Sequence, residues 1–511
     1  MNRHRTIVLG SGLRVVGLIL NIAAAFFVMP FVVHSLGDRL YGYWALVGAL
    51  VGYYGLLDLG IVSAVQFQVA SALGKQDLNL ANRSISTAFF TFSALGSVAL
   101  LLTVLLAVMA KFFFHSSDDI WLFRKVLLIM GIGFAVGFPG RVFVGAISAH
   151  LRWDLIAACD IGFLVARTLV IVAGIKFGGG LVFLAAVNVA ADAFSIGSQI
   201  LILHRIQHGL QISRKLASRS ILKQLMSYGG WASIIKIADQ LRFYVDGWVV
   251  GIFVGISSVT HYAIASRLSL SFMGLIIAVL GILSPWFSLM LGNKDYAGIR
   301  RVFSFGTKIS ASLSTIIAAC LLLYGYPFIA NWMGIGYIDA FWPLIILVIA
   351  VYSDVSQVPL VSYLYGVSKH GFLAKITLGE GLINFGLSIY LARRYGMTGV
   401  AIGTLIPMLI AKLCILPVYA CRQLNLPLAE YYLRILAKPA LFSASVVFFP
   451  WILVFRHFVT TNILSVVTLI IAQGILAVST MFFVLLTSAE RSQALSQLFS
   501  AGKARPLAMS N

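Results

Sequence analysis

The sequence is poor in cysteine and in the short motifs that hold catalytic groups or cofactors. Its four cysteines lie in or at the ends of apolar segments, which argues against a disulfide framework. They are Cys159, Cys320, Cys414 and Cys421. The chain has no P-loop, no zinc-type cluster of His and Cys, and no large polar loop that could hold an active site. These absences argue against an enzyme, a metal site and a bound cofactor.

Charge is scarce as well. Only 10% of the 511 residues are charged, whereas 60% are hydrophobic and the mean hydropathy is +0.98. Apolar segments recur along the whole chain, each near the ~20 residues that cross a hydrocarbon layer. They lack the period-two alternation of membrane barrel strands. The sequence therefore predicts an all-α polytopic membrane protein with about fourteen transmembrane helices.

The charge that is present is mostly basic, with 37 Lys and Arg against 16 Asp and Glu and a formal net charge of +21. With the N-terminus in the cytoplasm, about twenty basic residues fall on the cytoplasmic side and about eight fall outside, as the positive-inside rule requires. We therefore expect both termini in the cytoplasm. Arg14 and Asn21 interrupt the first apolar run, which favours a retained first helix over a signal peptide.

One apolar stretch, "KIADQLRFYVDGWVVGIFVG" at 236–255, contains four charges. At about 100° per residue these charges share one arc of a single helix. They are Lys236, Asp239, Arg242 and Asp246. Charges inside a membrane are costly and face a protein or water interior. Two interpretations stay open: pairing along the helix itself, or one wall of a substrate cavity.

The two halves of the chain resemble each other. The stretches "LGKQDLNLANR" (73–83) and "LGNKDYAGIRR" (291–301) share Leu, Gly, Asp and Arg at an offset of 218, the difference between Asp295 and Asp77. Each half has six expected spans, an even number. The halves therefore have the same orientation, as in transporters built from parallel repeats.

This repeat predicts the domain organisation. We expect an N-terminal six-helix lobe at 1–203 and a C-terminal six-helix lobe at 224–421. A peripheral helix pair and a cytoplasmic tail follow at 422–511. The basic segment 204–223 joins the two lobes. It either lies on the anionic inner leaflet or carries its charge for topology alone, and the sequence favours topology.

Basic side chains inside the predicted spans are candidates for a substrate cavity. Arg14 and Asn21 share a face of the first span, Arg141 follows the kinking sequence "FPG", and Arg267 has no acid in its own segment. If these side chains meet the face of 236–255, they line a cationic cavity. Guanidinium groups suit phosphate because they donate in a bidentate fork. The alternative is that each makes structural ion pairs between helices.

Four intramembrane acids are candidates for coupling transport to a proton or cation. They are Asp58, Asp192, Asp354 and Glu380. The alternative for each is a helix–helix hydrogen bond, which the sequence favours. We also expect Asp160 and Arg167, seven residues apart, to form a structural ion pair.

The opening of the chain resembles a known family. The resemblance is carried by Pro30, "SLGDRLYGYWAL" (35–46), "LLDLGI" (56–61) and, in the second half, "FVGISSVTHYAIASRLS" (253–269). These stretches are similar to the O-antigen and exopolysaccharide repeat-unit flippases of the multidrug/oligosaccharidyl-lipid/polysaccharide (MOP) superfamily.

That resemblance implies transfer of an undecaprenyl-pyrophosphate-linked oligosaccharide to the outer leaflet of a bacterial cytoplasmic membrane by alternating access. It also implies a glycan polymerase and glycosyltransferases as partners. A cation-coupled drug or metabolite antiporter of the same superfamily is the nearest alternative, and the surplus of intramembrane cations argues against it. A glycan polymerase or ligase is disfavoured because the outward loops are short.

Overall fold

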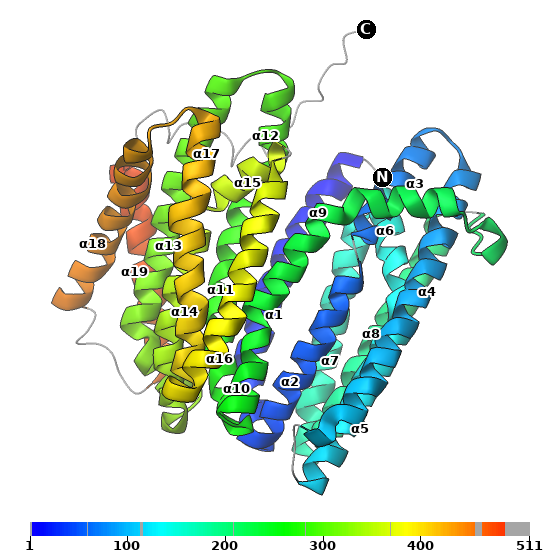
Figure 1. Cartoon of the computed structure of the whole chain (residues 1–511), viewed down its shortest axis with the longest axis horizontal. Helices are drawn as coiled ribbons and strands as arrows, with labels where there is room; N and C mark the ends of the chain where they lie inside the picture. The colour runs from blue at the N-terminus through cyan, green and yellow to red at the C-terminus, as the bar shows by residue number, and fades with distance from the viewer. Residues whose placement is uncertain are drawn as a thin grey trace. The chain divides into compact units, whose positions relative to one another are not determined.

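The computed structural model describes residues 3–58, 60–112, 116–207, 209–281, 283–367, 369–454 and 462–485. Within these ranges the chain forms helices and no strands (Figure 1). Twelve helical stretches of the described chain are long and apolar enough to cross a membrane. The prediction of an all-α polytopic membrane protein is confirmed.

The number of crossings agrees with the predicted count. One stretch, Gly371–Leu424, has 54 residues, or about 80 Å of helix, more than twice the thickness of the hydrocarbon core. It is divided at Gly396, whose φ of 57° and ψ of −142° suit only glycine. Helices α9 (Arg219–Phe243) and α10 (Val245–Phe253) lie outside the twelve. Counting the divided stretch twice and this pair once gives about fourteen crossings.

The chain divides into two compact units, Met1–Thr260 and His261–Asn511. The helices of the first unit, besides α9 and α10, are α1 (Arg3–Leu36), α2 (Asp38–Tyr54), α3 (Ile61–Gly74), α4 (Leu78–Met109), α5 (Ser117–Gly137), α6 (Arg141–Ala149), α7 (Trp153–Lys176) and α8 (Leu181–Ile206). Helix α11 (Ile256–Leu280) spans the boundary. The second unit continues with α12 (Leu283–Gly292), α13 (Tyr296–Trp332), α14 (Phe341–Val355), α15 (Val358–Gly366), α16 (His370–Leu409), α17 (Leu416–Leu424), α18 (Lys438–Leu453) and α19 (Ile463–Thr480).

In the first unit α1 packs on α7, and α5 packs on both α4 and α8. The α4–α5 contact depends on small residues, as in many membrane helix pairs. A Cβ on Gly96 of α4 would lie 2.6 Å from the backbone oxygen of Ala135 on α5. The apolar core of this unit joins α3, α4 and α6, and includes Phe92, Phe138 and Phe143.

In the second unit α13 contacts α14, α18 and α19. Tyr324 of α13 donates a hydrogen bond of 2.6 Å to Gln473 of α19, and Gln473 donates to the backbone oxygen of Val447 on α18. All three residues are buried. A polar contact therefore fixes the last two described helices against α13, where the sequence predicts a peripheral pair.

The two similar stretches of sequence adopt the same local structure. Asp77 accepts a hydrogen bond of 2.8 Å from the backbone nitrogen of Leu80 and caps α4. Asp295 caps α13 in the same way, through Gly298 at 2.8 Å. The residues before them, Gln76 and Lys294, have φ of 55° and 56°. Helices α4 and α13 begin at residues 78 and 296, again 218 apart (296 minus 78), so the repeat extends to backbone geometry.

The predicted lobes at 1–203 and 224–421 are not the same division as the two compact units. Helix α9 packs on α3 and α4, and α10 packs on α2, all within the first unit. The assignment of 224–260 to the second lobe depends on the sequence repeat and stays a prediction. The predicted cytoplasmic tail at 486–511 lies outside the described residues.

Candidate functional site

The charged stretch 236–255 is not one continuous helix. Helix α9 ends at Phe243 and α10 begins at Val245, with Tyr244 between them at φ −107° and ψ −18°. The prediction that all four charges share the face of a single helix is therefore wrong for Asp246, which lies on α10. The side chain of Lys236 lies outside the described part of the structure.

The pairing interpretation is confirmed for two of these residues. Arg242 donates to Asp239 at 3.1 Å, three residues earlier on α9. The Arg242 guanidinium also lies 4.3 Å from the centre of the Phe243 ring. Arg242 is 3% exposed and Asp246 is 2% exposed. Both side chains are thus held inside the protein, and a place for Arg242 in the wall of a substrate cavity stays a prediction.

The first unit contains a cavity of about 650 Å³ between α1, α6, α7 and α8. Eleven of its sixteen lining residues are apolar, and five polar side chains reach it. They are Asn21, Asp160, Arg167, Asp192 and Ser195. Asn21 and Asp192 are predicted site residues, whereas Asp160 and Arg167 are expected as a structural pair. An apolar cavity with a few convergent polar groups is the usual form of a small-molecule or headgroup site.

Charges converge beside this cavity. Arg141 interacts electrostatically with Asp58 and Asp192, and Asp192 interacts with Arg167 as well as Arg141. We call these four residues the unit 1 charge cluster. It contains two cations and two acids, so each charge has an opposite charge near it. The cluster brings together one predicted cavity residue, Arg141, and two predicted coupling residues, Asp58 and Asp192.

Two local breaks in the helices position this cluster. The sequence "FPG" forms a short 3₁₀ turn, η3 (Phe138–Gly140), so α5 ends and Arg141 opens α6. The Arg141 guanidinium lies 5.2 Å from the Phe134 ring centre and 4.9 Å from that of Phe138, a cation–π arrangement. The predicted break at Pro139 is confirmed.

Asp58 lies at the other break, in the 3₁₀ turn η1 (Gly55–Asp58) between α2 and α3. Its Oδ1 accepts from the backbone nitrogen of Val62 at 3.4 Å, and the residue is 8% exposed. A carboxylate at a helix start also complements the helix dipole. Asp58 therefore has a structural role in addition to its proximity to Arg141.

On α1, Asn21 reaches the cavity together with Leu13 and Gly17. The side chain of Arg14 lies outside the described part of the structure, so its predicted place on this face stays a prediction. On α7, Arg167 makes a hydrogen bond of 3.4 Å to Asn188 of α8. Arg267, another predicted cavity residue, belongs to α11 and is exposed.

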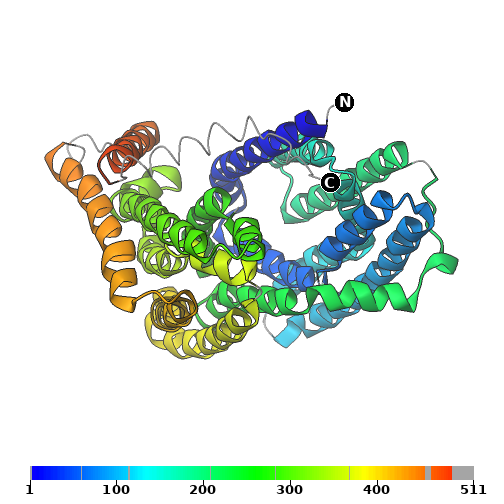
Figure 2. The ribbon, with the colours of Figure 1, turned by 90° about the horizontal axis from the view of Figure 1, so that it is seen from above.

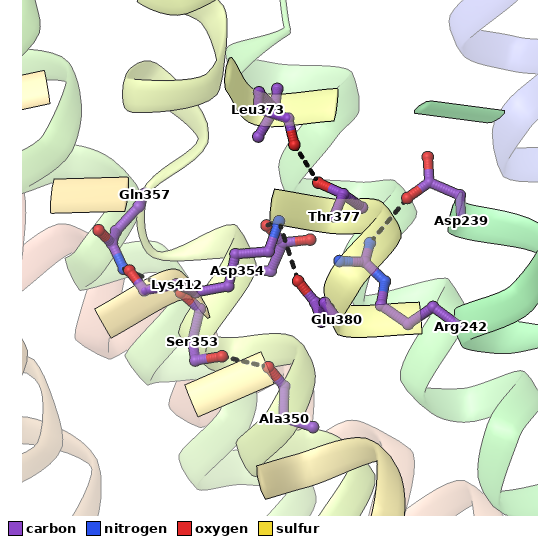
Figure 3. A network of polar contacts seen from close by, with 10 residues as sticks. All are labelled: Asp239, Arg242, Ala350, Ser353, Asp354, Gln357, Leu373, Thr377, Glu380 and Lys412. Carbon is purple, nitrogen blue, oxygen red and sulfur yellow. Dashed lines mark hydrogen bonds and ion pairs between the residues drawn. The ribbon is translucent and has the colours of Figure 1, made fainter. Parts of the chain in front are cut away.

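The second unit contains a buried lysine between two predicted coupling residues (Figure 3). The Lys412 Nζ lies 3.0 Å from Asp354 Oδ1 and 4.0 Å from Glu380 Oε2. Lys412 is 5% exposed and Glu380 is 3% exposed. We call Asp354, Glu380 and Lys412 the unit 2 triad. Its two acids come from α14 and α16, and its lysine from the π-helical turn Ile410–Ile415.

Further hydrogen bonds hold the triad in place. The Gln357 side chain donates to the backbone oxygens of Ser353 at 3.0 Å and Lys412 at 2.9 Å. The Tyr431 hydroxyl donates to the Gln357 carbonyl oxygen at 2.6 Å. An inserted residue in a π-helical turn changes which side chains face inward, and such turns concentrate at functional sites.

Three residues at these sites are absent from the predicted site residues: Arg167, Lys412 and Gln357. Arg167 and Lys412 both stand out as cations within apolar segments. The sequence predicts Asp160 as the partner of Arg167, whereas the structure also places Asp192 near it, and nothing in the sequence indicates the acids near Lys412. Gln357 carries no charge, so only its burial and its hydrogen bonds identify it. No group of three or more His, Cys, Asp or Glu that could hold a metal occurs among the described residues.

The chain has relatives among transporters. No protein-family model matches it. A protein of Shigella flexneri named "Putative O-antigen transporter" is 23% identical over 390 residues, which cover 73% of this chain and 88% of that protein. The resemblance to polysaccharide flippases of the MOP superfamily, seen first in the sequence, is confirmed.

Solved structures share the fold. The lipid II flippase MurJ in an inward closed conformation aligns with 93% of this chain and 99% of its own, with a TM-score of 0.71 at 14% identity. An inward-facing MATE-family multidrug resistance transporter of the MOP superfamily aligns with 80% of this chain and 94% of its own, with a TM-score of 0.68 at 14% identity. The chain is a multi-pass membrane protein with the fold of MOP-superfamily transporters.

Proposed function

We propose that this protein is a flippase for a lipid-linked glycan. Its substrate is an undecaprenyl-pyrophosphate-linked oligosaccharide repeat unit for O-antigen or exopolysaccharide synthesis. It moves this substrate from the inner to the outer leaflet of a bacterial cytoplasmic membrane by alternating access, and it catalyses no covalent step. Both termini lie in the cytoplasm, and a glycan polymerase and glycosyltransferases act nearby.

The similarity to the Shigella flexneri protein over 73% of the chain carries this proposal. The cavity of the first unit supports it, because Arg167 offers a guanidinium fork in a wall whose other residues are mostly apolar. A pyrophosphate headgroup suits such a fork, and the apolar lining suits the first part of a polyprenyl tail. Arg141 interacts electrostatically with Asp192 of the cavity wall and provides the second cation of the site.

The two charged groups of residues support coupling to a proton or Na⁺. Asp58 and Asp192 belong to the unit 1 charge cluster, and Asp354 and Glu380 to the unit 2 triad. Intramembrane acids of this kind commonly serve proton or ion pathways. In the triad the Lys412 ammonium already lies between the carboxylates, so an incoming ion there competes with a tethered cation.

The test is the sidedness of lipid-linked repeat units in the native bacterium after deletion of the gene. We expect these units to accumulate on the cytoplasmic face and wild type to restore their export. Arg167→Ala and Arg141→Ala should fail to restore it at matched membrane levels. Lys176→Ala, an exposed cation at the end of the same α7 helix, is the control and should restore export. Unchanged sidedness after deletion would refute the proposal.

One observation favours the antiporter alternative. The wall of the cavity contains two acids, Asp160 and Asp192, against the single cation Arg167. A surplus of acids suits cationic compounds. If Asp160→Asn and Asp192→Asn abolish resistance to a cationic dye while the export of glycan precursors is unaffected, the antiporter replaces the flippase.

A further inference from the structure

The basic segment from the end of α8 to the first two turns of α9 has a defined structure. From His204 to Met226 the sequence contains no Asp or Glu. Five cations of this segment are exposed: Arg205, Arg214, Lys215, Arg219 and Lys223. We call this segment the basic strap. The positive-inside rule is sufficient to explain the charge of this segment. Evidence for a further role must come from its structure.

Side chains of α4 fix the backbone of the strap. Asn82 donates to the backbone oxygen of Gly209 at 2.9 Å. The Ser86 hydroxyl accepts from the backbone nitrogen of Ser213 at 3.2 Å, and the Thr87 hydroxyl accepts from that of Ser218 at 3.0 Å. Three positions on one helix thus hold three points of the strap. A segment that acts only through its charge, by setting the topology, does not need a backbone held in this way.

The apolar side chains of the strap face the protein. Leu210 and Ile212 pack against the core cluster of the first unit, and Ile221 and Leu225 are buried within it. The strap therefore has an inner apolar face and an outer basic face. This arrangement directs its cations away from the core.

The first two turns of α9 continue the outer face. At 100° per residue, Arg219, Lys223 and Met226 fall within about 60° of one another, opposite Ile221 and Leu225. Met226 is 46% exposed. These turns of α9 run across the ends of the neighbouring helices rather than alongside them (Figures 1 and 2). Two cations beside an exposed apolar side chain are typical of a helix that lies in a membrane interface.

We propose that the basic strap binds the headgroups of anionic phospholipids in the leaflet beside it. The backbone of the strap is held by α4, its five cations are exposed, and it has no acid to offset them. The exposed Met226 side chain would then enter the edge of the acyl region. Each Lys or Arg near an anionic membrane surface strengthens binding by roughly fivefold. The bound lipids hold the start of α9 on the surface. This surface is separate from the substrate cavity and does not depend on the proposed function.

The test counts lipids bound to the purified full-length protein by native mass spectrometry, during titration with phosphatidylglycerol or phosphatidylcholine. We expect wild type to retain phosphatidylglycerol preferentially. The variant Arg214→Gln/Lys215→Gln/Arg219→Gln/Lys223→Gln should lose at least tenfold in apparent affinity for phosphatidylglycerol and remain unchanged for phosphatidylcholine. The charge-conserving variant Arg214→Lys/Arg219→Lys should bind as wild type does.

The control variant removes the same number of exposed cations elsewhere: Lys111→Gln/Lys125→Gln/Lys176→Gln/Arg394→Gln. It should keep the affinity of wild type. An equal loss in this control, or no loss in the strap variant, overturns the proposal. If the fourfold variant does not fold, Lys215→Gln/Lys223→Gln replaces it, with an expected loss of several-fold. Binding by wild type that is insensitive to ionic strength would also overturn the proposal, because contacts between charges at a surface are screened by salt.

Discussion

At the scale of single residues, Lys412 has the clearest energetic role. Burying a carboxylate is costly unless a cation or hydrogen bonds compensate it. In the unit 2 triad one ammonium group serves two acids, at 3.0 Å and 4.0 Å. Removing the lysine would leave the buried Glu380 and the partly buried Asp354 without its ammonium group. Replacing all three residues by neutral ones would leave no charge to compensate.

We therefore expect Lys412→Met to lower the free energy of unfolding by about 3–5 kcal/mol. The triple variant Lys412→Met/Asp354→Asn/Glu380→Gln should recover most of this loss. Thermal unfolding of the purified protein measures both effects. Lys375→Met, which removes an exposed lysine of α16, is the control and should change little. Equal Tm values for Lys412→Met and Lys375→Met would contradict the buried triad.

Gly96 is a second residue with a clear role, because it allows α4 to approach the backbone of α5 closely. A methyl group there would lie 2.6 Å from the Ala135 backbone oxygen, which cannot move without displacing α5. Gly96→Ala should lower Tm even though alanine favours helices by roughly 1 kcal/mol over glycine. Gly197→Ala on α8 has no atom within 4 Å of the added carbon and should be neutral or stabilising. A gain in stability from both variants would show that α4 and α5 do not pack this closely.

At the scale of helices, the repeated turn before α4 and α13 is the clearest correspondence between the halves. Each turn has a residue in the left-handed region, at Gln76 and at Lys294, followed by an aspartate that caps the next helix. The same short motif thus starts the long helix of each half. An N-cap aspartate contributes about 1 kcal/mol.

Asp77→Ala and Asp295→Ala should therefore destabilise the protein by similar amounts, about 1 kcal/mol each. Thermal unfolding of the two single variants checks this, and Asn79→Ala, an exposed position on α4, is the control. A large effect from one aspartate and none from the other would show that the two turns are not equivalent.

At the scale of the whole molecule, the distribution of Lys and Arg determines orientation. The predicted topology places the basic strap in the cytoplasm and the end of α7 outside. In a variant whose four cysteines are replaced by serine, Ala217→Cys should react with a membrane-impermeant thiol reagent only after the cells are permeabilised. Lys176→Cys should react in intact cells. Both positions are exposed. Labelling in the opposite pattern would invert the proposed orientation.

The amino-acid sequence was sufficient to predict the helical membrane class, the approximate number of crossings, the repeat at an offset of 218 and the interruption at Pro139. Each of these depends on apolar length, on local turn residues or on similarity between two short stretches of the sequence. It also identified most of the polar and charged residues that the structure brings together. Asn21 and Asp192 reach one cavity, Arg141 approaches Asp58 and Asp192, and Asp239 pairs with Arg242.

Which charges on different helices meet was known only from the packing of the helices. Periodicity describes one helix at a time, so it missed the break at Tyr244 that moves Asp246 onto a second helix. It could not join Lys412 to Asp354 and Glu380, which lie 58 (412 minus 354) and 32 (412 minus 380) residues earlier in the chain. An ion pair inside a membrane is set by helix packing and by irregular turns, and these depend on contacts between segments distant in sequence.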